Sequence, residues 1–470
     1  MTVPAAVLDL VRDYAAGAMR REHWLWGAGD PGPNAAGRRN AGRMRARIRD
    51  LVRNDPYARR ILDVLSANAI GEGIVPRAMT GNERRDGLLM AAWREWAETE
   101  AVDVAGLVDV YGLQEQAYRA WKESGEVFLR RVPVERAQAQ ALGLPLPLQI
   151  QVLEAEHLAA WREGSVEGGG RIVEGIEMDA QGRRLAYHFV ARHPGEVGTL
   201  PTREAERVPA ADVIHLFKAR RPGQLRGVPE LHAVALRVRA LQDYHEALLF
   251  RAKIEACLAA FVTTDADAAG APLGADTALQ DGQRLEQFEP GMVTYLKPGE
   301  AVTIASPTGS GAHNDYSRQS LQAIAVGAGI TYDQLTGDLT QANYSSLRAG
   351  KIEFRRMIRQ EQWQVLVPRL CARLWRWMVD AGGIAGRWPL VPAAAEWTPP
   401  RFEPIDPLKD VQADVLEVKA GFKTWSQAVA ERGWHADEQI AEIRDAAAKL
   451  AAAGVVLPEL GLTAAEADED

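Results

Sequence analysis

Apolar residues recur at helical spacing along the first quarter of the chain. Between residues 43 and 68 they follow the i, i+3, i+4 pattern of an amphipathic helix, with one interruption at Asn54-Asp55-Pro56. Because proline lacks the amide proton that a helix interior needs, we predict two helices that meet at Pro56 and a helix end before Gly71 and Gly73. Large apolar residues at similar spacing mark further helices and are expected to anchor the core: Trp93, Trp96, Leu113, Tyr118 and Trp121.

After Gly125 the period of the apolar pattern changes to that of strands. Runs of β-branched and aromatic residues predict strands in five segments, residues 126–130, 148–153, 171–174, 185–190 and 211–217. A turn at residues 179–182 predicts a hairpin over residues 177–190. An α+β body with antiparallel strands is therefore expected between residues 125 and 217.

Two long helices are predicted in the second half. The first begins near Pro229 and continues for nearly thirty residues, which corresponds to about 40 Å of helix. The second begins at a cap region in residues 343–346 and continues to about residue 380, with a kink at Pro368 and an end at Gly382 and Gly383. Helices of this length are typical of a structure larger than one compact domain.

Shorter elements are predicted between and after these helices. We predict two strands at residues 291–296 and 301–304 with a turn at 298–299, then a short helix at 317–330 and a polar loop at 336–342. An extended proline-rich segment (389–407), a helical region (408–452) and an acidic tail (466–470) follow. We find no internal repeat.

Composition excludes wholesale disorder. The 470 residues are 47% hydrophobic and 25% charged, which is the mix of a chain that buries a core. The net charge of -8 comes from residues 401–470, which hold 7 basic and 15 acidic residues, so that the first 400 residues are neutral. No run reaches the ~18 apolar residues of a membrane span, and the start of the chain lacks a signal-peptide pattern. We expect a protein made in a cytoplasm and used there or inside an assembly formed there.

The N-terminal region is basic and rich in glycine and proline. Residues 27–42 disfavour helix and strand, which predicts a loosely attached arm. Nine arginines lie between Arg38 and Arg60 and could track a phosphate backbone. A solvated helix face or a partner-binding arm is the simpler interpretation, since Asp50 and Asp55 interrupt the run.

The sequence carries no strong catalytic motif. Gly71-Glu-Gly73 lacks the third glycine of a dinucleotide-binding turn, and no GxxxxGK[ST] occurs. The histidines lie neither at HExxH spacing nor near paired cysteines, and Cys257 and Cys371 are expected to be buried thiols. Glu154-Ala-Glu156-His157 groups two carboxylates with an imidazole, as general acid–base catalysis requires, although a solvated loop is the simpler interpretation. We predict no catalytic residue, metal or cofactor.

Three blocks of sequence resemble the lambda-like family of tailed-phage portal proteins. The first block is Asn54-Asp-Pro-Tyr57 with Gly71-Glu-Gly-Ile74. The second comprises Ile214-His-Leu-Phe217, Arg221-Pro-Gly-Gln-Leu-Arg-Gly-Val-Pro229, Asp243-Tyr244 and Arg251-Ala-Lys253. The third comprises Thr331-Tyr332, Leu335-Thr-Gly-Asp338, Asn343-Tyr-Ser-Ser346 and Arg348-Ala-Gly350. Because the blocks follow in the same order, the resemblance extends from about residue 43 to residue 380.

The resemblance implies an α+β portal fold with an α/β wing, a two-helix stem, a small α/β clip, a long kinked wing helix and a helical crown. The implied segments are a flexible N-terminal arm (1–42), the wing (43–227), a first stem helix (228–257), the clip (258–312), a second stem helix (313–335), a channel loop (336–345), the long wing helix with an extended linker (346–400), and the crown with an acidic tail (401–470).

The resemblance also implies a function as a structural conduit. Portal proteins form a ring, commonly of twelve subunits, at the unique capsid vertex, through which double-stranded DNA is packaged and ejected without sequence specificity. The implied partners are terminase, the major capsid and scaffolding proteins, and head-completion or adaptor proteins. The implied location is the virion, with assembly in the host cytoplasm and no membrane contact.

Two sets of residues are expected to make these contacts. Small polar groups in the channel loop suit brief contacts with DNA phosphates: Thr336, Gly337, Asp338, Thr340, Gln341 and Asn343. Exposed residues of the clip are expected to bind partner proteins: Tyr295, Leu296, Lys297 and Pro298. The neutral-to-acidic charge fits a conduit, because a strongly basic channel would hold DNA.

The alternative is a cytoplasmic DNA-processing hydrolase. In that hypothesis the segment from Arg38 to Arg60 binds DNA, and Glu154, Glu156 and His157 form the hydrolytic site. Magnesium-dependent nuclease activity that is lost in a Glu154→Ala, Glu156→Ala variant would favour it.

Overall fold

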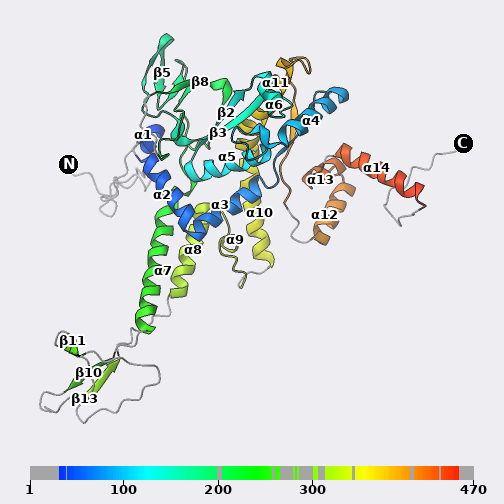
Figure 1. Ribbon diagram of the computed structural model, residues 1–470. Coiled ribbons are helices and arrows are strands. Elements are labelled where there is room, and N and C mark those ends of the chain that lie inside the picture. The colour runs from blue at the N-terminus through cyan, green and yellow to red at the C-terminus, as the bar shows by residue number, and fades with distance from the viewer. Residues whose placement is uncertain are drawn as a thin grey trace, which may run out of the picture.

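The computed structural model shows a layered body from which two helices extend to a small pair of strands (Figure 1). The structure describes residues 31–38, 40–197, 204–256, 260–264, 279–280, 283–284, 300–304, 313–340, 344–402, 407–432, 434 and 436–454.

The first two long helices of the body meet at Pro56, as predicted. α2 (Ala41–Asn54) ends there and α3 (Pro56–Ala69) begins, with the Asp55 side chain accepting a hydrogen bond from the Ala58 amide at 2.8 Å. Gly71 has a positive φ of 50°, which lets the chain turn away after α3.

The prediction that residues 27–42 disfavour helix is wrong for the short helix α1 (Pro33–Arg38). α1 is held against the body by the Asn34 amide, which donates to Gly223 O at 3.0 Å and accepts from Leu225 N at 2.8 Å. Arg38 also pairs with Glu163 at 2.7 Å. Tertiary contacts therefore override the weak local helix propensity.

Tryptophans on two helices anchor the core, as predicted. Trp93 and Trp96 on α4 (Glu83–Ala97) and Trp121 on α5 (Val110–Ser124) are fully buried. The ring of Trp93 lies 5.6 Å from that of Trp375, so the core joins helices from both halves of the chain.

Two antiparallel sheets follow α5. A three-stranded sheet has the order β3-β2-β9, and a five-stranded sheet has the order β4-β5-β6-β7-β8. Their strands are β2 (Val127–Pro133), β3 (Leu148–Glu154), β4 (Gly164–Val166), β5 (Gly170–Val173), β6 (Ile176–Met178), β7 (Arg184–Phe189), β8 (Glu206–Pro209) and β9 (Val213–Leu216). The pairing of β6 with β7 confirms the predicted hairpin.

Small elements complete the body. α6 (Arg136–Ala141) lies between β2 and β3, and β1 (Val75–Ala78) pairs antiparallel with β14 (Ala395–Thr398). The described residues also contain short 3-10 helices at Glu100–Val102, Ala155–His157, Glu167–Gly169, Ala210–Asp212 and Glu230–Ala233.

Two helices project from the body side by side (Figure 1). α7 (Ala235–Ala256) begins later than predicted, because a 3-10 turn occupies the residues after Pro229. It packs against α8 (His313–Ala328), with the rings of Tyr244 and Tyr316 4.6 Å apart. Beyond these helices, β10 (Ala260–Thr264) pairs with β13 (Glu300–Ile304), and β11 (Leu279–Gln280) pairs with β12 (Gln283–Arg284).

A long helical rod crosses the body. It consists of α10 (Tyr344–Glu361), a π-helical stretch (Gln362–Cys371) and α11 (Ala372–Ile384). Pro368, where we predict a kink, lies in this π-helical stretch, in which the wider turn accommodates a residue without an amide proton. Cys371 is a buried free thiol, as predicted, and burial raises its pKa. Cys257 lies outside the described residues.

The prediction that Gly382 and Gly383 end this rod is wrong. Both are helical, and the rod continues to Ile384. A Cβ atom at Gly382 would lie 1.8 Å from the Trp388 ring, so the missing side chain makes room for that tryptophan.

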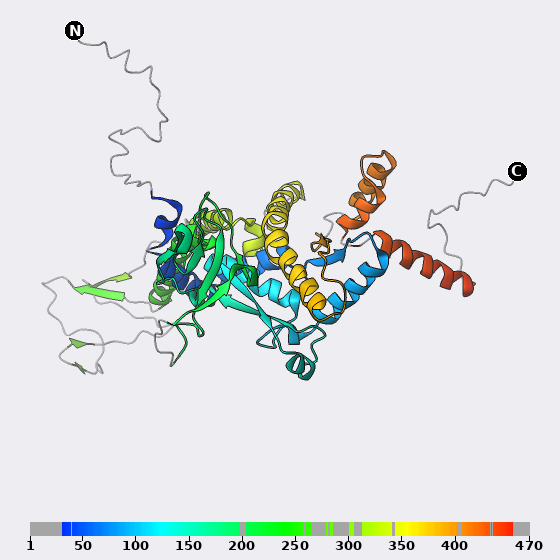
Figure 2. The same ribbon diagram turned by 90° about the horizontal axis from the view of Figure 1, so that it is seen from above.

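The C-terminal region is helical, as predicted, with α12 (Pro407–Lys419), α13 (Trp425–Glu431) and α14 (Ala436–Ala452). Viewed from above, these helices and the β10–β13 pair lie at opposite ends of the molecule (Figure 2). The mixture of helices with antiparallel sheets confirms the α+β fold class. None of the helices within the described ranges is long and apolar enough to span a membrane.

Candidate functional site

The predicted channel loop follows a short helix, α9 (Tyr332–Thr336). The Gln334 side chain accepts a hydrogen bond from Thr331 N at 3.0 Å, and Gly337 ends the helix with a positive φ of 71°. Thr336 is therefore the last residue of a helix rather than part of the loop. Gln341 and Asn343 lie outside the described residues.

Asp338 and Thr340 form a compact turn. The Asp338 carboxylate accepts hydrogen bonds from the Thr340 amide at 3.0 Å and from the Thr340 hydroxyl at 2.6 Å. These hydrogen bonds lower the pKa of Asp338, so its carboxylate is ionised at neutral pH. Leu339, between them in sequence, is 60% exposed, so this turn of the predicted polar loop also presents an apolar side chain. The turn offers one fixed negative charge and one exposed leucine.

The predicted partner-binding residues of the clip, Tyr295, Leu296, Lys297 and Pro298, lie outside the described residues. The structure describes only short strand pairs near them in sequence. Those residues stay a prediction.

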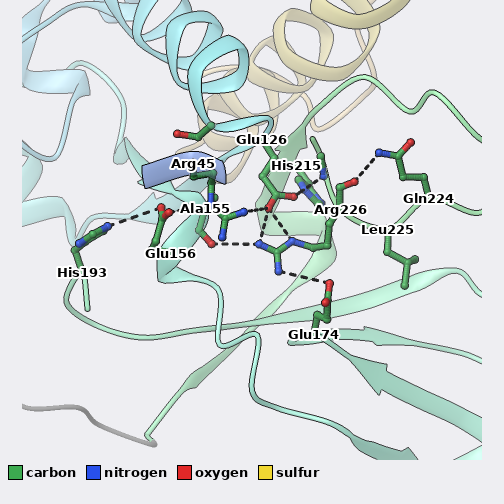
Figure 3. Close-up of polar contacts among 12 residues, drawn as sticks. Arg45, Glu126, Ala155, Glu156, Glu174, His193, His215, Gln224, Leu225 and Arg226 are labelled. Atoms are coloured by element: carbon green, nitrogen blue, oxygen red, sulfur yellow. Dashed lines mark hydrogen bonds and ion pairs between the residues drawn. The ribbon is translucent and has the colours of Figure 1, made fainter. Parts of the chain in front are cut away.

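A buried carboxylate, that of Glu126, lies among Arg45, His215 and Arg226, next to the segment that leads to α7 (Figure 3). Glu126 has no exposed surface and accepts hydrogen bonds from Arg226 Nε and from Gly227 N, both at 2.8 Å. Arg45 adds an ion pair at 3.7 Å from the same carboxylate. Gly227 is required here, because a Cβ atom would lie 1.9 Å from the carbonyl oxygen of Gly125. The junction thus ties α2, the start of β2 and the segment that leads to α7.

The tautomer of His215 follows from its neighbours. Its Nε2 lies 3.0 Å from Glu126 Oε2, which accepts only, and its Nδ1 lies 3.0 Å from Arg184 Nη1, which donates only. The neutral imidazole with its proton on Nε2 satisfies both contacts. Burial lowers the pKa of His215 to about 3, which agrees with the neutral form. Burial alone would raise the pKa of Glu126, but Arg226 and His215 outweigh it and hold the pKa far below its usual range.

These shifts predict that acid destabilises the fold. Folded His215 resists protonation, so its contribution is lost as pH falls from its ordinary pKa of 6.5 toward 3. Folded Glu126 resists protonation too, so its contribution is lost as pH falls below its ordinary value of 4.5. Urea unfolding followed by tryptophan fluorescence is expected to show a decline that begins near pH 6.5 and steepens below 4.5. A His215→Gln variant is expected to show a shallower decline above pH 4.5, where His157 and His188, whose pKa values burial also lowers, still contribute; an unchanged profile would contradict the assignment.

The two carboxylates of the hydrolase hypothesis, Glu154 and Glu156, form ion pairs with arginines. Glu156 Oε1 lies 2.9 Å from Arg45 Nε, and Glu156 Oε2 lies 2.9 Å from Arg49 Nη2. Glu154 also pairs with Arg49, at 3.2 Å. Burial would raise the pKa of Glu156, but the two guanidinium groups lower it, so this carboxylate is a poor proton donor or acceptor near neutral pH. Arg45 is buried and Arg49 is largely buried, so neither is exposed for contact with a phosphate. Arg43, Arg47 and other arginines of the run are exposed and form a solvated face.

The nearest imidazole to these carboxylates is that of His193, which the sequence analysis did not select. Its Nε2 lies 3.2 Å from Glu154 Oε2, and the ligand atoms of Glu154, Glu156 and His193 all lie within 4.8 Å of one another. The ring of His157 lies 5.4 Å from the ring of His193. A divalent cation at this point would face the guanidinium of Arg49, so the arrangement does not favour a metal-dependent hydrolytic site.

A second buried carboxylate braces the long rod where its π-helical stretch begins. Glu361 accepts from Lys122 Nζ at 2.7 Å and from the Tyr118 hydroxyl at 3.0 Å. Lys218 lies 3.2 Å from the same carboxylate. Burial would raise the pKa of Glu361, but Lys122 and Lys218 lower it. α5, the segment after β9 and the rod are therefore locked together by charge.

Comparison with known proteins assigns this architecture to a family. A sequence model described as phage portal protein, lambda family, matches residues 19–362, well over half of the chain. The chain belongs to this family. The resemblance noted in the sequence blocks is confirmed, and the chain is a phage portal protein, a structural component of the capsid vertex and not an enzyme.

Individual portal proteins of phages are similar along much of the chain. The probable portal protein of Halomonas phage phiHAP-1 is 25% identical over 406 residues, which cover 83% of this chain and 76% of the relative. The portal protein of Escherichia phage N15 is 25% identical and covers 62% of each chain. Portal protein B of Escherichia phage lambda is 25% identical and covers 55% of each chain, so the match spans less than two thirds of these last two relatives.

Solved structures share the fold. A chain from the virion of a native gene transfer agent particle has a TM-score of 0.51 and 16% identity, and the match covers 88% of this chain and 98% of that chain. A chain from the neck of an empty gene transfer agent particle has a TM-score of 0.51 and 17% identity, with the same coverage. At 16–17% identity the likeness shows only that this chain shares their fold.

Proposed function

We propose that this portal protein forms a ring of twelve subunits through which double-stranded DNA passes during packaging and ejection, without sequence specificity. In the host cytoplasm the ring nucleates procapsid assembly with the major capsid and scaffolding proteins. It docks terminase and later head-completion or adaptor proteins through the clip, where Tyr295, Leu296, Lys297 and Pro298 are the proposed contacts. α7 and α8 are the stem of this ring, α12–α14 its crown.

The observation that carries the ring proposal is the apolar surface of the stem. On α7, Leu236 is 75% exposed and Phe250 is 66% exposed, while on α8 Val326 is 80% exposed. The two helices already bury Val238 and Ile324 on other faces. Helices that are apolar on more than one face need a second partner, and neighbouring copies of the same stem in a closed ring supply it.

The charge of the chain supports a conduit. The net charge is -8, and the described part of the channel loop contributes the carboxylate of Asp338. Repulsion between this carboxylate and DNA phosphates keeps contact weak, while the hydroxyl of Thr340 and exposed Leu339 allow brief contacts that read no sequence.

Replacing residues 336–343 with a Gly/Ser linker is expected to leave rings intact but to impair genome packaging or retention. The linker removes the fixed turn made by Asp338 and Thr340, so the loop no longer presents a defined surface to DNA. The measurement is DNA content per head together with electron microscopy of the rings.

A matched control replaces Glu196 and Val197, an exposed pair on the wing, with glycine and serine. This control is expected to package normally. Normal packaging and retention by the loop variant would contradict the DNA-facing assignment of the channel loop.

A further inference from the structure

A groove with a volume of about 1130 Å³ lies between the body and the C-terminal helices. Its walls come from α3, α9, α10, the linker after β14 and the chain around Trp434. Five cationic side chains line it, against the two carboxylates of Glu72 and Asp333: Arg60, Lys351, Arg355, Arg401 and Arg432. Arg432 is already paired with Asp414 at 2.9 Å, and the other four cations still outnumber the two carboxylates, so the groove is a cationic surface on a chain whose net charge is negative.

Aromatic rings support the cationic wall. The Arg355 guanidinium lies 5.2 Å from the ring centroid of Phe402, and that of Arg401 lies 5.8 Å from the ring centroid of Trp434. Trp434 is 48% exposed. Lys351, one turn before Arg355 on α10, has no ion-pair partner among the residues that the structure describes. Such a groove fits a peptide that is both acidic and apolar.

We propose that this groove binds residues 455–470 of the same chain. The segment contains five acidic residues and no basic one: Glu459, Glu466, Asp468, Glu469 and Asp470. It also contains an apolar run: Val455, Val456, Leu457, Leu460 and Leu462. The apolar run matches the aromatic lining, and the acidic residues match the arginines and Lys351.

The length of the segment allows binding within one chain. Ala436, the first residue of α14, lies next to Trp434 in a second cavity that adjoins the groove. The 17 residues of α14 carry the chain about 25 Å away from that point. The 16 residues that follow Gly454 span up to about 53 Å when extended, so they reach back to the groove with several residues left to occupy it.

Binding of this segment places negative charge beside the channel loop. Gly337 and Leu339 line the same groove, so the acidic residues neutralise the cationic wall next to the loop. A neutralised wall attracts DNA phosphates less strongly than the same wall without the segment, which favours passage over retention.

Zero-length carbodiimide cross-linking of the full chain, followed by mass spectrometry of its peptides, tests the proposal. Lys351 is expected to couple to at least one of the five acidic residues of the segment. The Lys423–Asp414 pair, 2.8 Å apart, provides an internal positive control. Coupling of Lys423 without any coupling between Lys351 and the segment would overturn the proposal.

Two further arms make the test specific. Arg401→Glu is expected to lower the Lys351 coupling yield roughly fivefold, while Arg136→Glu, an exposed site on α6, is expected to leave it unchanged. Equal yields in both variants would contradict the role of the groove. In a mixture of isotopically heavy and light chains, coupled peptides are expected to carry a single label; mainly mixed-label peptides would overturn binding within one chain.

Discussion

Replacing Glu126 with glutamine is expected to lower the free energy of unfolding by about 3–5 kcal/mol. The carboxylate is fully buried and accepts from Arg226, Gly227 and His215. Glutamine keeps the volume but removes the charge, so Arg226 loses its nearest counter-ion and keeps only Glu174, at 3.9 Å. Urea unfolding at pH 7, followed by tryptophan fluorescence, measures the change.

Glu206→Gln is the matched control for this prediction. Glu206 also pairs with an arginine, Arg130, but its side chain is 59% exposed. Solvent screens this pair, so the expected change is only about 0–1 kcal/mol. Equal effects of the two substitutions would show that the junction at Glu126 does not hold the body to the segment that leads to the stem.

The double substitution Leu249→Asp, Phe250→Asp is expected to abolish ring formation while the monomer stays folded. Both side chains are exposed on α7, at 58% and 66%, so the isolated subunit tolerates the change. In the proposed ring we expect the same positions to be buried against the neighbouring stem, where unpaired carboxylates are costly. Size-exclusion chromatography with light scattering measures the oligomer, and circular dichroism checks the fold.

The conservative variant Leu249→Met, Phe250→Leu keeps an apolar surface and is expected to form rings. Rings formed equally well by the aspartate variant would mean that this face of α7 does not contact a neighbour. Loss of rings in both variants would point to exact shape rather than apolar burial as the requirement.

The regular elements could be predicted from local sequence because their signals are local. Pro56 breaks the first helix, and Asp55 before it caps the next one. The turn at residues 179–182 lies between two segments in which apolar and polar residues alternate. The portal family could also be recognised from the sequence, because its blocks combine turn residues such as Gly227 and Pro229 in a fixed order.

Elements that depend on distant partners could not be predicted in this way. Gly382 resembles a helix stop until Trp388 is seen to fill the space that its missing side chain leaves. Helix α1 has weak propensity and exists because Asn34 binds backbone groups near residue 224. In both cases the deciding contact comes from tertiary packing.

The DNA-facing role of the channel loop stays a prediction. Asp338 and Thr340 lie together in an exposed turn, but Thr336 belongs to α9. Glu156 was selected as a catalytic candidate because its neighbours in sequence are ionisable, whereas its partners in space are Arg45 and Arg49. The buried role of Glu126 leaves one trace in the sequence, a lone charge at the start of an apolar strand beside Gly125.

Electron microscopy of the purified full chain, with native mass spectrometry of the same sample, tests the central claim most directly. The account predicts rings with a central hole and a mass of twelve subunits. A compact dimer without a hole at high protein concentration would contradict it.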